Sequence, residues 1–257
     1  MIAVERHGDV IRFRMASWRS RLIRYEVSAY LTHGVLVDTG FPLAGRALRR
    51  VLREFPVHGA LLTHAHEDHA GNAPLLASLG IPIGMSDATR EALRAHEPIR
   101  AYRRFTWGAP AAFTAPDASF TPDALALLPS PGHSADHHIA WDAARETLFT
   151  GDLWLGVRVK IAHAEEDPRT LVRSLRAAIA LRPKQMFDAH RGPVRDPVRA
   201  LEAKAGWLED TIAAIEARIA AGWSDRAILR EVLGGDELTA VVSRGEYARM
   251  NLVRALR

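Results

Sequence analysis

The sequence contains no cysteine, which excludes a disulfide framework and also removes thiolates from the set of metal ligands. Any metal ion in this protein must therefore be held by imidazole and carboxylate groups. No apolar run reaches membrane-spanning length, and residues 1–10 lack the charged, apolar and small-residue regions of a signal peptide. We therefore expect a cytoplasmic protein with no membrane association.

The charge balance also limits the classes of partner. The chain of 257 residues has a formal net charge of +4, and arginine supplies nearly all of the cationic side chains. Such a charge permits an anionic substrate but does not demand a nucleic-acid partner. The length fits one large domain, or one domain with a small appendage.

Strand-like and helix-like segments alternate over most of the chain. Short runs rich in β-branched and aromatic residues predict strands, while apolar residues at helical spacing predict the helices between them. After about residue 197 the pattern becomes helical, so we expect an α/β domain over residues 1–197 and a mainly helical region over 198–257. The predicted strands lie at 11–15, 25–31, 34–38, 57–63, 81–85, 124–128, 137–141, 147–150, 185–190 and 238–242, and the predicted helices at 44–55, 72–80, 87–96, 168–181, 199–221, 225–233 and 246–256.

One short loop concentrates metal-ligand chemistry. The stretch T-H-A-H-E-D-H-A-G (63–71) follows an apolar, strand-like run and contains His64, His66, Asp68 and His69. On a loop after a strand, ligands two positions apart can converge on one ion while the next pair turns toward a second ion. Imidazole and carboxylate groups suit zinc, and iron or manganese less selectively. One loop cannot complete two coordination shells, so further ligands are required downstream.

Three downstream residues stand at the ends of predicted strands or turns and are candidates for those ligands. They are His133 in S-P-G-H-S, Asp152 in F-T-G-D and His190 in D-A-H-R-G. A site at one edge of a sheet requires ligands at such positions. The other histidines show no comparable pattern and are expected at surface or packing positions; they are His7, His33, His58, His96, His137, His138 and His163.

These motifs, in this order and spacing, resemble the metallo-β-lactamase superfamily, and V-D-T-G (37–40) is an additional match. The resemblance spans about residues 10–195 and implies an α/β fold of the αββα sandwich type, with metals at one edge between the two sheets. It also implies that Asp38 accepts a hydrogen bond that orients a ligand imidazole. The implied ligands are His64, His66 and His133 for one metal, Asp68, His69 and His190 for the other, and Asp152 as the bridge between them.

The resemblance predicts a metal-dependent hydrolase. Two divalent cations that share a carboxylate, most favourably Zn²⁺, can share a water and lower its pKa, so that hydroxide attacks a carbonyl carbon or a phosphorus. Asp68 would orient this nucleophile while binding the second metal, whereas Glu67, at the variable position of the motif, is expected to point away. True β-lactamases of this fold typically lack the bridging aspartate, so Asp152 favours thioesterases of the glyoxalase II type, nucleases or lactonases. We therefore expect hydrolysis of an ester, thioester or lactone in a small substrate. The positive net charge of the chain is compatible with an anionic group on that substrate.

The C-terminal region resembles the small winged-helix-like tail of the β-lactamase-like protein 2 group, through G-W-S-D-R-A-I-L-R-E-V-L-G (222–234) and S-R-G-E-Y-A-R-M-N-L-V-R-A-L (243–256). That group includes endoribonucleases, which makes a metal-dependent endoribonuclease the alternative function. The tail arginines are spread along helical positions rather than clustered with aromatics, so packing on the α/β domain or a homodimer interface is favoured over RNA binding. A mononuclear-iron persulfide dioxygenase is a further, less favoured alternative.

Two regions are candidates for contacts with the substrate. In residues 97–124, the arginines Arg100, Arg103 and Arg104 would receive an anionic group and Trp107 would form an apolar wall, as parts of a lid over the metals. The alternative for this region is a connecting helix whose aromatic residues pack on the sandwich. Arg158 and Lys160, which follow the T-G-D motif closely, would face either the same pocket or solvent.

Overall fold

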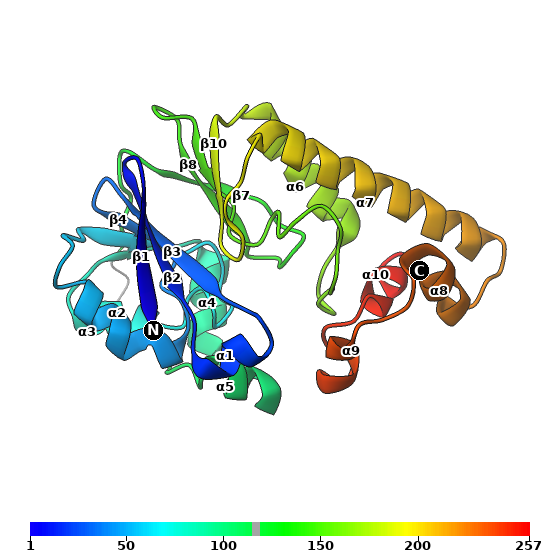
Figure 1. Cartoon of the computed structure of the whole chain (residues 1–257), viewed down its shortest axis with the longest axis horizontal. Helices are drawn as coiled ribbons and strands as arrows, with labels where there is room; N and C mark the ends of the chain where they lie inside the picture. The colour runs from blue at the N-terminus through cyan, green and yellow to red at the C-terminus, as the bar shows by residue number, and fades with distance from the viewer. Residues whose placement is uncertain (115–118) are drawn as a thin grey trace.

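The computed structural model describes residues 1–114 and 119–257 (Figure 1). Residues 115–118, which belong to the region predicted as a lid, therefore lie outside the described residues. Two β-sheets form the larger part of the molecule, and a long helix leads away from them into the C-terminal region. Among the described residues, no helix has both the length and the apolar character needed to cross a bilayer.

The first sheet contains six strands in chain order. Its first four strands pair antiparallel, whereas the last two join parallel to their neighbours. All residues of β3 are buried, as expected for a strand that is covered on both faces. β1 lies outside the predicted strands because it is a half-exposed edge strand whose charged residues Glu5 and Arg6 interrupt the apolar run. The strands are β1 (Ile2–His7), β2 (Val10–Met15), β3 (Val27–Thr32), β4 (Val35–Val37), β5 (Gly59–Leu61) and β6 (Ile83–Gly84).

The second sheet contains five strands in the order β11-β10-β9-β8-β7. β9 and β10 are parallel, and the other neighbouring pairs are antiparallel. The parallel pair is joined by a crossover through the long helix α6, as parallel strands require. The strands are β7 (Ala126–Pro129), β8 (His138–Asp142), β9 (Thr147–Phe149), β10 (Gln185–Asp188) and β11 (Gly192–Pro193).

Helices cover the outer face of each sheet, which confirms the predicted αββα sandwich. Leu48 of α2 and Leu76 of α3 pack in one apolar cluster with residues of the first sheet. Leu175 of α6 and Leu201 of α7 pack in another cluster with residues of the second sheet. The helices are α1 (Trp18–Leu22), a 3₁₀ turn η1 (Pro42–Ala44), α2 (Gly45–Val51), α3 (Ala73–Ser78), α4 (Asp87–Ala95), α5 (Ala101–Trp107), α6 (Pro168–Ala180), α7 (Pro197–Ala220), α8 (Asp225–Leu233), α9 (Leu238–Val242) and α10 (Met250–Arg254).

A third apolar cluster lies between the two sheets and holds them together. Tyr30 and Leu61 come from the first sheet, and Phe149 and Phe187 come from the second. The Tyr30 ring lies 5.5 Å from the Phe149 ring and 5.3 Å from the Phe187 ring, between ring centroids. Each buried aromatic side chain contributes about 1.5–3 kcal/mol relative to an exposed one. This packing fixes the two sheets so that the loops bearing the predicted ligands meet at one edge.

The C-terminal region packs on the second sheet through α7, which lies beside α6 (Figure 1). Two hydrogen bonds tie α7 to the loop after β9: the Trp154 indole N–H donates to the Ala200 carbonyl oxygen at 3.0 Å, and Lys204 Nζ donates to the Trp154 carbonyl oxygen. Beyond α7, a separate apolar cluster joins α8 and α10, with Ile228 and Leu252 among its members. The expected helical tail is therefore present, and it is anchored to the sandwich.

Two details of the tail prediction are wrong. Residues 238–242, predicted as a strand from their β-branched residues, form helix α9. No sheet edge of the described residues reaches this segment, and Leu238 and Val241 are exposed, so local helical hydrogen bonds satisfy its backbone instead. The last predicted helix, 246–256, shortens to Met250–Arg254, because Tyr247 instead makes an isolated β-bridge with His163.

Lys204 gives a test of the anchoring of the tail. Its side chain is buried, and burial, only partly offset by Glu166, Asp188 and Asp152, lowers the pKa of Lys204 from 10.5 to about 8. The folded state therefore disfavours the charged amine. This lowers the stability of the fold fully below pH 8, and the effect disappears as the pH rises from 8 to above 10.5. We therefore compare the free energy of unfolding of Lys204→Met with that of wild type. The difference should favour the variant by about 3 kcal/mol more at pH 7 than at pH 10.5.

The measurement is urea unfolding of both proteins at the two pH values, with Lys184→Met as a control. Lys184 is exposed and pairs with Glu146 at the surface. A surface ion pair of this kind contributes little to stability, so replacing Lys184 should change stability by a similar small amount at both pH values. A pH-independent difference for Lys204→Met would contradict the assignment.

Candidate metal centre

The predicted ligands lie on loops at one edge of the sandwich. The loop with His64, His66, Asp68 and His69 begins just after β5, which ends at Leu61 rather than at residue 63. His133 precedes β8, Asp152 follows β9 and His190 follows β10. Both sheets therefore contribute to the site, as a ligand set drawn from motifs far apart in the chain requires.

Four of these residues form a first cluster. His66 Nδ1 lies 3.1 Å from His64 Nε2 and 3.1 Å from His133 Nε2. His133 Nε2 also lies 3.4 Å from Asp152 Oδ2. One ligand atom from each residue lies within 4.8 Å of all the others. This spacing suits a single metal ion, which holds its nitrogen and oxygen ligands at about 2.0–2.2 Å.

Asp68, His69 and His190 form a second cluster beside the first. His190 Nε2 lies 3.5 Å from Asp68 Oδ2. Asp152 faces this cluster as well, because its Oδ1 lies 3.1 Å from His69 Nε2 and 3.3 Å from His190 Nε2. The two carboxylate oxygens of Asp152 thus point to different clusters, which is the arrangement that the resemblance implied for a bridging ligand.

The tautomers of the histidines can be read from their outer hydrogen bonds. His190 Nδ1 lies 2.7 Å from the Glu26 carbonyl oxygen, which can only accept, so this nitrogen carries the proton. His133 Nδ1 faces Glu166 Oε1 at 3.1 Å, and His69 Nδ1 faces Asp38 Oδ2 at 2.8 Å. In each case the Nε2 lone pair is left to point into the clusters. These outer partners fix the imidazoles in the form that binds a metal.

Among the buried side-chain atoms that lack a hydrogen bond to any described residue, two lie where a cation fits. They are His69 Nε2 and Asp152 Oδ1, which face one another without hydrogen-bond geometry. Unsatisfied buried polar atoms are costly, by about 1–3 kcal/mol each or more when charged. A cation that accepts both lone pairs removes this cost, so the residues present fit a metal ion.

The electrostatic environment differs from one candidate ligand to another. Burial and the neighbouring imidazoles lower the pKa of His64 and of His66 well below the ordinary value, so both are neutral ligands near pH 7. Burial also acts to lower the pKa of His190, but Asp152 and Asp68 outweigh it and raise that pKa to about 9. The same negative field that favours an imidazolium favours a bound cation at the second cluster.

Asp38 holds the metal loop from the first sheet. It follows β4 with a φ of 61°, in the left-handed region, and its carboxylate accepts from the Thr63 backbone N–H at 2.9 Å and from the Thr63 hydroxyl. The Thr63 hydroxyl also lies 3.0 Å from His64 Nδ1. One carboxylate therefore reaches an imidazole of each cluster, His69 directly and His64 through Thr63, in keeping with the predicted orienting role.

Asp188 and Asp136 hold two other loops, and no role was predicted for either. Asp188 is fully buried, and its carboxylate accepts from the backbone N–H groups of His190, Arg191 and Leu155 at 2.8–3.0 Å. Asp136 accepts from the Ala65 backbone N–H at 2.8 Å. The sequence D-A-H offered a signal for this role, because Asp188 stands two residues before His190 and a short carboxylate can accept hydrogen bonds from the backbone of the turn that follows it.

His137, expected at a surface or packing position, lies against the site. It is fully buried, and its Nε2 accepts from the Asp152 backbone N–H at 3.0 Å while Nδ1 faces the Ser130 carbonyl oxygen at 3.1 Å. Burial lowers the pKa of His137 to about 3, so it stays neutral. Gly151 packs so closely on it that a Cβ there would lie 2.8 Å from His137 Nε2. His137 thus fixes the backbone that presents Asp152.

Glu67 belongs to neither cluster, in keeping with the expectation that it points away. It is buried and accepts two hydrogen bonds from Arg103 of α5, one of them from Nε at 2.7 Å. Arg103 also donates to Glu246 Oε1 at 3.1 Å. The guanidinium that reaches the metal loop is therefore that of Arg103 and not that of Arg104, which is exposed on the other face of α5.

The other predicted substrate contacts belong to neither ligand cluster. Arg158 and Lys160 are exposed. Trp107 is buried in the core, where its ring centroid lies 5.0 Å from that of Phe41 and 6.4 Å from that of Tyr25. Trp107 therefore supports Tyr25, which itself contacts His190 with 5.8 Å between ring centroids. α5 is a packed helix, in agreement with the alternative prediction for this region.

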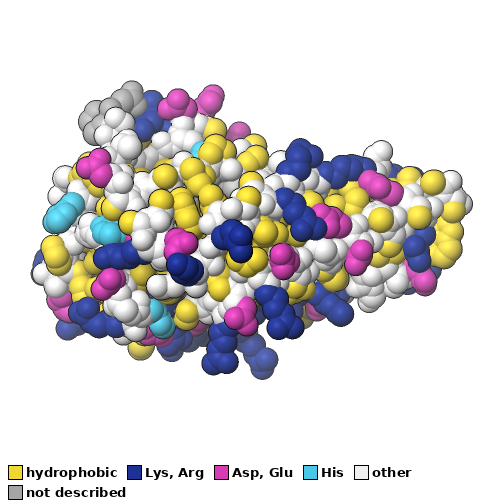
Figure 2. All heavy atoms as spheres, turned by 90° about the horizontal axis from the view of Figure 1, so that it is seen from above, with side chains coloured by type: hydrophobic (Ala, Val, Ile, Leu, Met, Phe, Trp, Pro, Cys, Tyr) yellow, Lys and Arg dark blue, Asp and Glu magenta, His cyan; other side chains and the backbone are white. Residues whose placement is uncertain are grey.

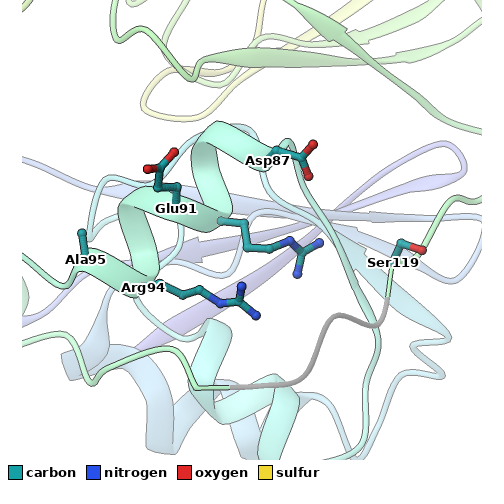
Figure 3. A pocket seen from close by; sticks show the side chains of 6 residues that line it. Asp87, Glu91, Arg94, Ala95 and Ser119 are labelled. Carbon is teal, nitrogen blue, oxygen red and sulfur yellow. The ribbon is translucent and has the colours of Figure 1, made fainter.

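A cavity of about 710 Å³ beside α4 does not coincide with the metal clusters (Figure 3). None of the predicted ligands lines it. In the view, Asp87 and Glu91 project from the upper part of α4, and Arg94 extends from its lower part toward the side on which Ser119 lies. This cavity is therefore separate from the candidate metal centre, whose chemistry resides in the two clusters.

A model of the family described as "Metallo-beta-lactamase superfamily" matches residues 25–190. The chain therefore belongs to the metallo-β-lactamase superfamily, and the resemblance seen in its motifs is confirmed. It is 30% identical over 174 residues to "Beta-lactamase-like protein 2 homolog" of Caenorhabditis elegans, covering 64% of this chain and 54% of that protein. It is 32% identical over 127 residues to "Probable metallo-hydrolase YybB" of Bacillus subtilis (strain 168), covering 47% of this chain and 56% of that protein. The chain spans about half the length of these curated relatives.

Solved structures support the same fold. A metallo-beta-lactamase family protein from Thermus thermophilus superposes with a TM-score of 0.62 at 19% identity, over 88% of each chain. A metallo-beta-lactamase from Pontibacter korlensis gives a TM-score of 0.62 at 18% identity, over 82% of this chain and all of that one. At such low identity the similarity shows the fold alone and gives no information about the substrate.

His137 gives a test of how the site is held. Replacing it by alanine leaves the buried Asp152 N–H without an acceptor and opens a cavity, so we expect His137→Ala to lower the free energy of unfolding by at least about 2 kcal/mol. The control is the neighbouring His138→Ala, since His138 is only half-buried; its expected loss is below about 1 kcal/mol. Urea unfolding in the presence of a chelator measures both, and equal losses would contradict the role given to His137.

Proposed function

We propose that this protein is a dinuclear metal-dependent hydrolase that cleaves an ester, thioester or lactone bond in a small substrate. The observation that carries the proposal is Asp152, whose two carboxylate oxygens face two separate ligand clusters. Family membership and the likeness to a protein named a probable metallo-hydrolase support the hydrolytic class. A cytoplasmic location belongs to the same proposal, as does a homodimer.

The donor set favours zinc, with iron or manganese as alternatives, because it contains only imidazole and carboxylate groups. His64, His66 and His133 would hold one ion, Asp68, His69 and His190 the other, and Asp152 both. Divalent cations bound there would act as Lewis acids and make water nucleophilic near neutral pH.

The protein's own groups would supply orientation and a dry environment. Asp68 has the most exposed ligand side chain of the second cluster, at 14%, so its carboxylate can meet an incoming water and accept its hydrogen bond. That contact would aim the water lone pair at the scissile carbonyl carbon. The burial of His64 and His69 excludes bulk solvent from behind the reacting groups, which strengthens electrostatic interactions in the site.

Other reactions of the superfamily fit less well. The aspartate at position 152 disfavours a β-lactamase, and two complete clusters disfavour a mononuclear-iron dioxygenase. The endoribonuclease alternative requires a tail that offers cations to phosphates. In the tail, Arg249 instead donates to the carbonyl oxygens of Leu233 and Gly235, and Arg257 pairs with Asp225. On the face seen in Figure 2, Lys and Arg side chains are interspersed with Asp and Glu rather than gathered into one patch.

The first test combines metal content with a substrate panel. We expect the purified chain to take up about two zinc ions, and a panel of thioester, lactone, ester and phosphodiester substrates to reveal hydrolysis that chelation abolishes and zinc restores. Asp152→Asn should lower kcat at least about 100-fold and reduce the zinc content, because both clusters lose a charged ligand. The control is Asp9→Asn, a carboxylate whose side chain is exposed at the surface. Normal turnover of Asp152→Asn would refute the site.

The second test separates small substrates from RNA. We expect the zinc-loaded chain to bind labelled single-stranded RNA weakly, with a shallow dependence of log affinity on log salt, because tail cations such as Arg249 and Arg257 are bound within the protein. Fluorescence anisotropy at several salt concentrations measures this slope. Tight binding that weakens steeply with salt, together with RNA cleavage, would replace the small-molecule proposal by the endoribonuclease one.

A further inference from the structure

The segment that links α9 to α10 folds back onto the sandwich. Tyr247 forms its β-bridge with His163, on the loop between β9 and α6, and the Ala248 N–H donates to the Ala162 carbonyl oxygen at 3.0 Å. Asn251 Nδ2 donates to the same carbonyl oxygen at 3.0 Å. In Figure 1 this loop descends beside α9 and α10. The C-terminal region therefore touches the sandwich at a second place, apart from the contact through α7.

Glu246 is the centre of this second contact. Its carboxylate accepts from the Tyr102 hydroxyl at 2.8 Å, from Arg103 Nη1 at 3.1 Å and from Arg100 Nε at 3.1 Å, and it lies 3.3 Å from His163 Nε2. Only 11% of the Glu246 side chain is exposed, so these charge-assisted bonds are sheltered from solvent. They fix the backbone next to Tyr247 against α5.

The same contacts lead directly to the metal loop. Arg103, bound to Glu246, also binds Glu67, which stands between the ligands His66 and Asp68. A chain of buried ion pairs thus runs from the metal loop through α5 to the tail. Removing one partner of such a chain leaves an uncompensated buried charge, so its geometry is held tightly.

This network places Tyr247 against His163, which in turn contacts His66 of the first cluster. Its ring centroid lies 4.9 Å from that of His163, whose ring lies 5.7 Å from that of His66. The Arg103 guanidinium lies 5.8 Å from the centre of the Tyr247 ring. Burial, together with the negative charges of Glu67 and Asp68, raises the pKa of Tyr247 well above its ordinary value, although Arg103 opposes this. The phenol therefore stays protonated, so its hydroxyl is able to donate a hydrogen bond.

Resting on the proposed hydrolase function, we propose that Tyr247 is a substrate-contacting residue of the metal site and donates a hydrogen bond to an oxygen of the group bound there. Glu246 is its positioning residue. The tail thereby completes the substrate site, and the hydrolase needs its C-terminal helices to recognise substrate. The contact suits substrates with an oxyanion or carbonyl oxygen beside the reacting centre, where an uncharged donor adds no repulsion to the bound cations.

The test uses the zinc-loaded full chain and inorganic phosphate as the probe, since phosphate is a tetrahedral oxyanion like the species formed during carbonyl hydrolysis. Zinc content and affinity are measured first, and phosphate affinity is then measured by calorimetry. We expect Tyr247→Phe to keep wild-type zinc binding and to weaken phosphate at least about tenfold, as the loss of a hydrogen bond to a charged group predicts. On any substrate that the panel reveals, the loss should also appear in kcat/KM.

Tyr102→Phe is the matched comparison, because it removes the same atom from a ring 6.2 Å away whose hydroxyl is already bound to Glu246. Its loss of phosphate affinity should be clearly smaller than that of Tyr247→Phe. Equal losses would assign the effect to tail packing and overturn the proposal, as would unchanged phosphate affinity in Tyr247→Phe or a zinc-loaded wild type that does not bind phosphate. Absence of zinc binding in wild type would instead refute the proposed function itself.

Discussion

The buried carboxylate of Asp152 is the constraint on which the site depends. It lies among His69, His133 and His190, each with Nε2 within 3.1–3.4 Å of one of its oxygens. A carboxylate removed from water is strongly unfavourable unless positive charge compensates it, either from protonated neighbouring imidazoles or from bound cations. The outer hydrogen bonds of these histidines turn their Nε2 atoms inward, so bound cations fit between them and Asp152. The position of Asp152 therefore favours the binding of cations at this site.

Much of the surrounding structure serves to hold that placement. His137 fixes the backbone N–H of Asp152, and Asp188 fixes the turn that carries His190. From the first sheet, Asp38 holds the loop with His64 and His69. These supports come from both sheets, and the aromatic packing of Tyr30 on Phe149 and Phe187 keeps the sheets in register with each other. The geometry of the candidate ligands thus depends on the packing of the core between the two sheets.

The C-terminal region is bound to the sandwich at both ends of the site. The carbonyl oxygen of Trp154, two residues after Asp152, accepts a hydrogen bond from Lys204 of α7. Arg103 joins Glu67 of the metal loop to Glu246. Both connections involve buried charged groups, whose partners must be present for the fold to be stable. A tail held in this way belongs to the same packed unit as the sandwich, which agrees with the packing role favoured from its scattered arginines.

The sequence by itself determined the candidate ligands and the layered fold, because these candidates follow strand ends at characteristic spacing and apolar periodicity marks the strands and helices around them. It did not determine which neighbours surround those ligands. His137 and Arg103 reach the site through pairings between residues 15 and 36 positions apart, and Tyr247 reaches it from the far end of the chain. Residues 238–242 likewise form a helix despite their β-branched composition, since no partner strand of the described residues reaches them. Local pattern records what a residue can do, whereas its partners depend on how distant segments pack, and only the tertiary structure decides that.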